Sequence, residues 1–208
     1  MPYTNYKRVD EVLGEFDISY SEQNFIQMME IPVLEYFEAE IKLTLSESVY
    51  KNSESALCES LIYPTLREVW KLYKKDLLLW SHQPLNYGDN RFAVPDYLIA
   101  KRSPMGNIFL EKPSLIIIGV KHESFEEAWI DCISNMMAAR RANQMSKNEA
   151  NFAPIFGIVS NGVIWEFAIL DTNYFVKEIT IYTIQNLKLL FSAIGYMFEQ
   201  AKLAIATL

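Results

Sequence analysis

The sequence has few of the residues from which cysteine and histidine sites are built. Cys58 and Cys132 are its two cysteines, and they lie far apart without CxxC spacing, so neither a disulfide framework nor a cysteine zinc site is indicated. His82 and His122 are its two histidines, which excludes a histidine-rich metal centre. Neither cysteine has a histidine close in sequence that would support a thiol nucleophile. The sparse cysteine content favours a reducing, cytoplasmic setting.

Long apolar runs are also missing. No run approaches the roughly 18 apolar residues that a membrane helix needs, and the first residues, MPYTNYKRVDEVLGEF, lack the apolar stretch of a signal peptide. The stretch LKLLFSAIGYMFEQAKLAIATL comes nearest, but Lys188, Glu199 and Lys202 interrupt it. We interpret it as a core or interface helix and expect no membrane association.

That C-terminal helix has an apolar surface wider than one packing face usually requires. We therefore expect it either to cover a sheet or to form a two-fold homodimer contact. The apolar residues concerned are Leu187, Leu190, Phe191, Ile194, Met197, Phe198 and Ala201.

Phosphate-binding loops and dinucleotide fingerprints are absent from the sequence, and positive charge is in short supply. A formal net charge of -7 disfavours holding DNA by bulk electrostatics, so any DNA contact requires a local basic patch. Arg140 and Arg141, with Lys147 beyond them, form such a cluster. Two adjacent arginines near a helix end also complement the helix dipole.

The chain contains no internal repeat, low-complexity segment or linker rich in glycine, proline or serine, so we expect residues 1–208 to form one domain. The pattern predicts a mixed α/β sheet with helices on its faces. The first predicted elements are a helix over about 21–45 and a helix from Asn52 or Ser53 that bends at Pro64. Three strands follow, at Leu77–Ser81, RFAVPDYLIAKR and SLIIIGVKH, and then a helix that begins at Ser124. The last elements are a hairpin in IFGIVSNGVIWEFAIL with a type I′ turn at Asn161–Gly162, a strand at YFVKEITIY and the C-terminal helix.

Two of these strands carry a charge at a position expected to be buried. A period of two places Asp96 on the face of Val94 and Leu98, and it places Gly119 and Lys121 on the face of Leu115 and Ile117. If the two strands pair as a hairpin, the carboxylate and the ammonium converge on one side of the sheet. Burying either charge alone costs several kcal/mol, so each needs a partner. A structural ion pair, or a lysine that reaches solvent at a strand end, is the alternative explanation.

A third charge lies on the helix that follows Ser53. Glu54 is in its first turn, and Leu57 and Leu61 follow at i+3 and i+7, which puts the Glu54 carboxylate on the core-facing stripe. The helix dipole explains an acidic residue near a helix N-terminus. It does not explain why this acid shares the apolar face.

The order of these parts resembles the PD-(D/E)XK nuclease superfamily, which has the restriction endonuclease-like fold. Glu54 stands on an early helix, Pro95-Asp96 on a strand, and Lys121 at the end of an apolar strand that leads into a helix. SESALCESLIYPTL and IFGIVSNGVIWEFAIL look like the first helix and the later hairpin of the N-terminal nuclease domains of type I restriction subunits. The resemblance covers roughly residues 53–170, with an N-terminal helical extension and the C-terminal helix outside it.

The resemblance implies a Mg²⁺-dependent site, with Mn²⁺ as a substitute. Glu54 and Asp96 would be metal ligands, the backbone carbonyl of Val120 a further ligand, and Lys121 the catalytic lysine that positions or activates the attacking water. Phosphodiester hydrolysis places extra negative charge on the phosphate in the transition state, and a hard cation held by oxygen ligands neutralises that charge. DNA is the expected partner.

The sequence departs from the family motif at Gly119, which occupies the position of an acidic residue. Some members of the superfamily supply this acid from the next helix, where Glu126, Glu127 and Asp131 are available. Helical geometry disfavours this, because it places Glu127 and Asp131 on the side away from Phe125, Trp129 and Cys132. Glu123 shares the face of Lys121 but lies about 13 Å along the strand from the vacant position.

Two functions therefore follow from the resemblance. One is a Mg²⁺-dependent DNA endonuclease, which the retention of Glu54, Asp96 and Lys121 favours. The other is a catalytically inactive nuclease-like module that serves binding or assembly, which Gly119 and the acidic net charge favour.

Overall fold

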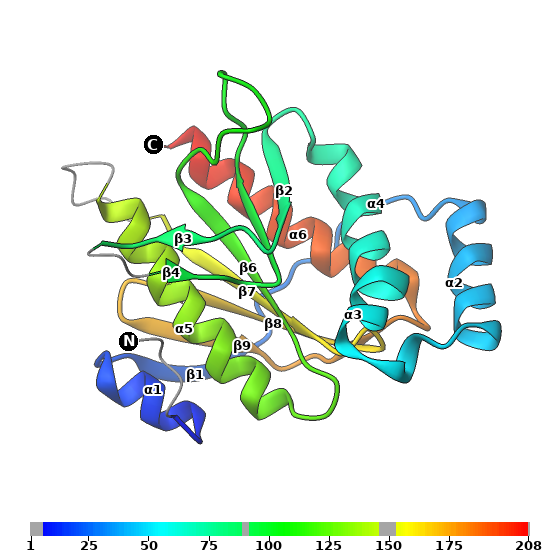
Figure 1. The fold of residues 1–208 in the computed structure, drawn as a ribbon, viewed down its shortest axis with the longest axis horizontal. Coiled ribbons are helices and arrows are strands. Elements are labelled where there is room, and N and C mark those ends of the chain that lie inside the picture. Colours follow the sequence, from blue (N-terminus) through cyan, green and yellow to red (C-terminus); the bar gives the residue numbers. More distant parts are fainter. Residues whose placement is uncertain (1–5, 89–91, 146–152, 208) are drawn as a thin grey trace.

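The computed structural model describes residues 6–88, 92–145 and 153–207, and its centre is an eight-stranded mixed sheet (Figure 1). The sheet contains both parallel pairs (β1–β9 and β6–β7) and antiparallel pairs, so the fold is α/β with a mixed sheet, as predicted. In spatial order the strands are β1 (Ser19–Gln23), β9 (Tyr174–Glu178), β8 (Ile164–Asp171), β7 (Ile155–Ser160), β6 (Ser114–Val120), β5 (Tyr97–Lys101) and β2 (Leu77–Ser81), with β10 (Tyr182–Thr183) paired to β8.

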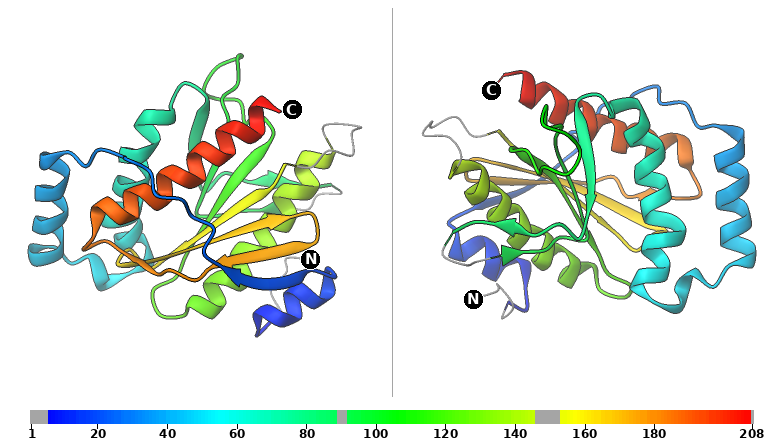
Figure 2. Two further views of the ribbon diagram at one scale, coloured as in Figure 1. Left: turned by 180° about the vertical axis from the view of Figure 1, so that it is seen from behind. Right: turned by 45° about the horizontal axis from the view of Figure 1, so that its top comes forward.

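Helices cover both faces of this sheet. Figure 2 shows α6 crossing one face and Figure 1 shows α5 crossing the other. The helices are α1 (Val9–Glu15), α2 (Glu35–Glu47), the 3₁₀ turn η1 (Tyr50–Asn52), α3 (Glu54–Leu57), the π-helix η2 (Cys58–Ile62), α4 (Tyr63–Tyr73), α5 (Phe125–Gln144) and α6 (Leu187–Ala206). A small separate ribbon pairs β3 (Leu85–Asn86) with β4 (Phe92–Ala93).

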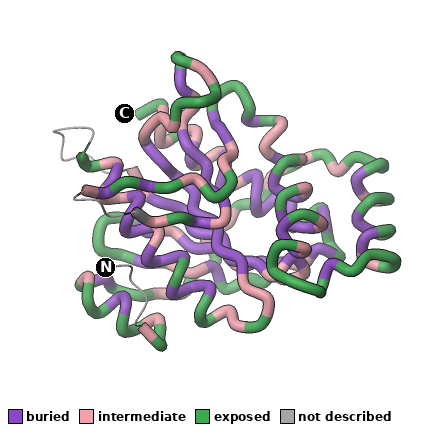
Figure 3. The backbone as a smooth tube through the Cα atoms, in the orientation of Figure 1, coloured by how far each residue is buried: buried purple, intermediate pink, exposed green. Residues whose placement is uncertain are grey.

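The hydrophobic core has one layer on each side of the sheet. The first layer joins the sheet to α2, α3, α4 and α6, and the second joins it to α1 and α5. Strand β6 is buried along its whole length and contributes to both, since Ile116 and Ile118 lie in the first layer and Ile117 in the second. Leu115 lies in the first layer instead of sharing the face of Ile117, close to where the β5–β6 register shifts. In Figure 3 the buried segments follow the strands, whereas much of α2 is exposed.

The strands beside Asp96 and Lys121 do pair. β5 runs antiparallel to β2 and β6, and β6 is joined through α5 to the parallel strand β7. A crossover helix is the usual connection between parallel neighbours. This arrangement brings the beginning of β5, the end of β6 and the first turns of α5 to one end of the sheet.

The helix predicted from Ser53 is confirmed at its start. The Ser53 hydroxyl accepts a hydrogen bond of 3.1 Å from the Ala56 N–H and caps α3. The chain then widens into η2 and returns to α-helix at Tyr63, with Pro64 in the first turn of α4. Pro64, which has no N–H to donate, therefore follows directly after the widened turn, and the bend expected at this proline stays a prediction.

The helix predicted over residues 21–45 is wrong in its first half. Residues Ser19–Gln23 form β1, which pairs with β9, and α2 begins only at Glu35, after Pro32. The pairing of β1 depends on a strand about 150 positions later in the chain, so periodicity alone did not reveal it.

One predicted strand and one predicted turn need correction. The segment RFAVPDYLIAKR is not one strand, because β4 ends at Ala93 and β5 begins at Tyr97. Val94, between them, is exposed, so it does not share a buried face with Asp96. In the β7–β8 hairpin the Asn161 N–H donates to the Ile164 carbonyl and the positive φ angle (+81°) falls on Gly162. Glycine at the first central position is the arrangement of a type II′ turn, not type I′.

The C-terminal helix covers the sheet. All seven apolar residues expected on its wide surface are buried within this chain, because the sheet lies on one side and α4 on another. The apolar surface that motivated a homodimer contact is therefore not available, and dimerisation stays a prediction without this support.

Candidate functional site

Lys121 lies directly after β6 and between two carboxylates. Its Nζ is 3.5 Å from Asp131 Oδ2 on α5 and 4.0 Å from Glu54 Oε1 on α3. Partial burial by itself lowers the pKa of Lys121, but the two carboxylates outweigh this effect and raise the pKa above its ordinary value. The lysine is thus a fixed positive charge between the first turn of α3 and the second turn of α5.

Asp96 lies immediately before β5 and faces the end of β6. Its Oδ2 accepts a hydrogen bond of 2.8 Å from the Val120 N–H, and its side chain is 34% exposed. Burial raises the pKa of Asp96, while the bond from Val120 and the nearby His82 partly oppose the rise. Asp96 does not form the expected direct ion pair with Lys121, although the two charges are close enough to interact.

Glu54 is held by the cap of α3. Ser53 starts the helix, Leu57 and Leu61 are buried as predicted, and the Glu54 side chain remains 50% exposed beside Lys121. The π-helix η2 follows directly, and such widened turns occur frequently at functional sites. The structure therefore brings Glu54, Asp96 and Lys121 to one end of the sheet.

Gly119 packs against α5. A Cβ atom at this position would lie 3.3 Å from the Ala128 carbonyl oxygen and 3.4 Å from Cys132 Cβ, which is tighter than ordinary van der Waals contact. The close approach of α5 to β6 explains the glycine in physical terms. An acidic side chain at this position, as in the family motif, would require α5 to shift away from β6.

Asp131 was expected to point away from this site, and that expectation is wrong. Helical geometry does place it next to Cys132, which packs on β6, so Asp131 lies at the edge of the buried stripe and reaches Lys121. Glu127 and Glu123, in contrast, form no ion pair with Lys121. Within the described part of the chain, the carboxylates paired with Lys121 are those of Glu54 and Asp131, and Glu123 is 89% exposed beside His122.

His82 is a neighbour of Asp96 that the sequence analysis did not select. Its Nε2 lies 3.8 Å from Asp96 Oδ1, its Nδ1 lies 2.8 Å from the Ser81 hydroxyl, and its φ angle is +49°. The β2–β5 register, in which Ser81 pairs with Tyr97, places His82 opposite Asp96. A prediction that paired these two strands in the correct register would have placed His82 beside Asp96.

The donor chemistry of the site suits Mg²⁺ in part. Asp96, Glu54 and Asp131 provide the carboxylate oxygens that Mg²⁺ prefers. However, over residues 6–88, 92–145 and 153–207 no three side chains of His, Cys, Asp or Glu are grouped so as to hold a metal ion. The role of the Val120 carbonyl as a ligand stays a prediction, as does the metal itself.

The arginine pair lies on α5, far along the helix from Lys121, and makes intramolecular contacts. Arg140 donates a hydrogen bond to the Thr172 carbonyl, and the Arg141 guanidinium lies 5.5 Å from the centre of the Phe16 ring. These contacts agree with a structural role near the end of α5. Lys147 lies outside the described residues.

Comparison of the chain with protein-family models and with curated proteins finds no match. The resemblance to the nuclease superfamily therefore rests on the residues and their arrangement. Of the helices in the described ranges, α6 has the length and apolar composition that would suffice to cross a membrane, and half of that stretch is buried inside the molecule. Core helices commonly have these properties.

Proposed function

We propose that this chain is a nuclease-like module that hydrolyses DNA phosphodiester bonds with Mg²⁺ or Mn²⁺. The observation that carries the proposal is the position of Lys121 between Glu54 and Asp131, beside an Asp96 carboxylate bound to the end of β6. The order of helix, antiparallel strands, helix and parallel strand also agrees with the resemblance. Asp131 adds a carboxylate beside Lys121, where its role is to hold the ammonium.

Each residue has a defined role in this proposal. Asp96 and Glu54 would hold the metal ion, which when bound neutralises charge on the phosphate. Lys121 remains protonated because of its carboxylate neighbours, so it acts by orienting an oxygen atom or stabilising negative charge, not by accepting a proton. Asp131 holds the Lys121 ammonium at the end of β6.

The test is a plasmid-nicking assay in Mg²⁺ and in Mn²⁺. We expect wild type to nick supercoiled DNA, and Asp96→Asn and Lys121→Met each to reduce the rate by about two orders of magnitude, the usual cost of removing one such stabilising group. Asp131→Asn should reduce it also. Glu123→Gln is the matched control, because it removes one exposed carboxylate from the same loop and should leave the rate unchanged.

Nicking that survives both Asp96→Asn and Lys121→Met would contradict the proposal, since it would arise at another site or from a contaminant. Wild type that fails to nick in either metal, while remaining folded, would exclude the endonuclease function under these conditions and favour the second function.

The second function is a catalytically inactive module that serves binding or assembly. The tight packing at Gly119 and the absence, in the described ranges, of three grouped metal ligands favour it. It differs from the first function in a simple measurement. If the module is inactive, isothermal titration with Mn²⁺ should give the same heat for wild type and for Asp96→Asn. A heat of binding that is present in wild type and lost in Asp96→Asn would favour the first function.

A further inference from the structure

Strand β2 forms one end of the sheet and is unpaired on its outer side. In the part of the chain that the structure describes, β2 pairs with β5 alone, so its other edge faces away from the sheet (Figures 1 and 2). The residues of β2 carry no charge, whereas β1 at the opposite end of the sheet carries Glu22. Charged side chains normally protect an edge strand from pairing with another chain. The outer edge of β2 is therefore the less protected of the two.

Two backbone hydrogen bonds show which residues of β2 point outward. At one end of the β2–β5 pair the Asp76 carbonyl accepts a bond from the Arg102 N–H, and at the other end the His82 N–H donates to the Asp96 carbonyl. Antiparallel strands exchange hydrogen bonds at every second residue. The even-numbered residues of β2 therefore bond to β5, and the odd-numbered residues direct their N–H and C=O groups outward.

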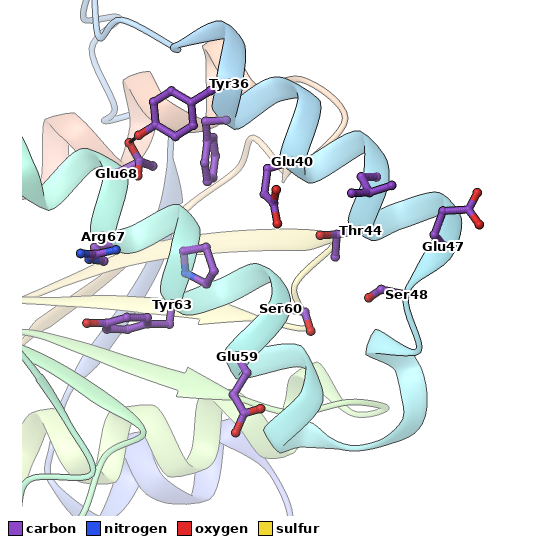
Figure 4. Close-up of a pocket in the computed structure, with 13 residues that line it drawn as sticks. Tyr36, Glu40, Thr44, Glu47, Ser48, Glu59, Ser60, Tyr63, Arg67 and Glu68 are labelled. Carbon is purple, nitrogen blue, oxygen red and sulfur yellow. Dashed lines mark hydrogen bonds between the residues drawn. The ribbon is translucent and has the colours of Figure 1, made fainter.

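Helix α4 covers the start of this outer edge. The Trp70 indole N–H donates a bond of 2.9 Å to the outward carbonyl of Leu77. α4 is itself held against α2 by a hydrogen bond from a tyrosine hydroxyl of α2 to Glu68 (Figure 4). Among the described residues, none forms a hydrogen bond with the outward N–H and C=O groups of Leu79 and Ser81. These groups match the backbone of another extended strand.

The free edge is complementary to itself. When two copies pair antiparallel about a two-fold axis, Leu79 of each copy lies opposite Ser81 of the other and they exchange four N–H···O=C bonds, while Leu77 keeps its bond to Trp70. The same register places Trp80 opposite its counterpart. Trp80 is partly exposed on the α5 side of the sheet, and aromatic pairs directly across two strands stabilise a sheet.

The two ends of the edge carry opposite charge. Asp96 lies beside the last residue of β2, with Glu54 and Asp131 behind it around Lys121, so this end is acidic. The start of the edge is basic. The charged residues there are Lys74, Lys75, Asp76, Lys101 and Arg102. An antiparallel pair brings the basic start of one copy beside the acidic end of the other, so charge favours this pairing.

From these observations we infer that the outer edge of β2 docks the β2 strand of a second copy of this chain, so that the two sheets join into one across a two-fold axis. The candidate site of each copy then lies beside the start of the partner's β2, because Asp96 follows the end of the edge. This interaction is separate from the proposed DNA hydrolysis and does not rest on it.

Sedimentation velocity at tens to hundreds of micromolar tests the pairing. We expect wild type to pass from monomer to dimer over this range. Ser81→Pro removes one outward N–H but no bond to β5, as proline does on an edge strand, so it should abolish the dimer with an unchanged circular dichroism spectrum. Ser81→Ala keeps the N–H and should dimerise like wild type. The inference is overturned by a wild type that stays monomeric, whether or not an added extended peptide binds it, or by a dimer that Ser81→Pro leaves intact.

The charge of the edge gives a second test. Lys74→Glu with Lys75→Glu should raise the dimer dissociation constant at least about tenfold, because both ends of the interface lose complementary charge. The control pair, Lys42→Glu with Lys188→Glu, changes the net charge equally at exposed positions on α2 and α6 and should have less than about a twofold effect. Equal weakening by the two pairs would reflect general repulsion and would contradict docking at β2.

The register gives a third test. Trp80→Cys places two thiols directly opposite each other, so mild oxidation should link the copies by a disulfide. Leu43→Cys, at an exposed position of α2, should stay unlinked, and the native Cys58 and Cys132 are buried. Non-reducing electrophoresis separates the linked and unlinked chains. A wild-type dimer whose Trp80→Cys variant does not cross-link, or cross-links no more than Leu43→Cys, would show that the copies meet at another surface.

Discussion

At the scale of single residues, the end of β6 shows how a charge is retained beside a buried strand. Desolvation disfavours the Lys121 ammonium, and the carboxylates of Asp131 and Glu54 offset that cost. Asp96 is stabilised differently, by the Val120 N–H, and retains a raised pKa. The site therefore contains one charge that its partners stabilise and one that burial still disfavours.

The raised pKa of Asp96 predicts how stability depends on pH. Because the folded state binds this proton more tightly than the unfolded chain, the stability from Asp96 is fully present below the ordinary value of 3.8 and is lost as pH rises through the folded pKa. Asp96→Asn stays neutral at every pH. We expect its free energy of unfolding in urea to exceed that of wild type at neutral pH and to approach it well below pH 3.8. A constant difference at all pH values would contradict this cause.

Gly119 makes a second residue-scale prediction. Gly119→Ala introduces a Cβ against Ala128 and Cys132, so we expect a loss of about 1–3 kcal/mol in the free energy of unfolding, as for other overpacked core positions. Gly119→Glu should lose more, and it should not restore a metal site. Gly14→Ala is the control, because Gly14 lies at the end of α1 with open space around it and should be neutral or stabilising. Thermal unfolding of the three variants measures the difference.

At the scale of elements, the α3–η2–α4 segment contacts the candidate site at two points. Its first residue, Glu54, faces Lys121. Tyr63 stacks on Tyr97, the residue after Asp96, with ring centres 5.9 Å apart. The position of this segment therefore affects both the lysine and the start of β5.

The cap of this segment is open to a direct test. Ser53→Ala removes the hydrogen bond to the Ala56 N–H and should cost about 1 kcal/mol of stability, the usual value for an N-cap. Ser53→Asp keeps an acceptor at the same place and should retain most of the stability. Urea denaturation gives both values. A Ser53→Ala variant as stable as wild type would show that tertiary packing, not the cap, holds the start of α3.

At the scale of the whole molecule, α6 decides how the sheet is covered. It fills the side opposite α5, and its central residues, Ala193, Ile194, Met197 and Phe198, have no exposed surface. A helix buried to this extent stabilises its own chain in preference to an assembly. The length and apolar composition of α6 therefore have a sufficient explanation in the core.

This burial predicts a large difference between two positions of α6. Phe198→Ala should cost about 3–5 kcal/mol, because Phe198 packs on Tyr73 within the core. Leu203→Ala should cost much less, since Leu203 is 49% exposed. Denaturation curves measure both, and sedimentation velocity of wild type at tens of micromolar tests association. A dimer that Phe198→Ala dissociates without unfolding would contradict the assignment of this surface to the core.

Local signals in the sequence determined many of the elements. Continuous apolar residues predicted β6, serines at helix starts predicted the caps of α3 and α5, and Asn161–Gly162 predicted a hairpin turn. The positions of Glu54 in the first turn of α3 and of Lys121 at the end of β6 followed from the same patterns, whereas Asp96 lies before β5 and not within the strand predicted for it. These features depend on residues within one or two turns of each other, so the sequence contains the necessary information.

Only the tertiary structure decided the features that depend on distant segments. The pairing of β1 with β9 and the burial of α6 require surfaces from separate parts of the chain. The direction of Asp131 was misjudged because a helical wheel gives the face of a residue but not which strand end that face meets. Gly119 is the clearest case: the sequence showed that an acid is absent, and the close approach of α5 to β6 supplied a reason, since a Cβ there would press on the Ala128 carbonyl.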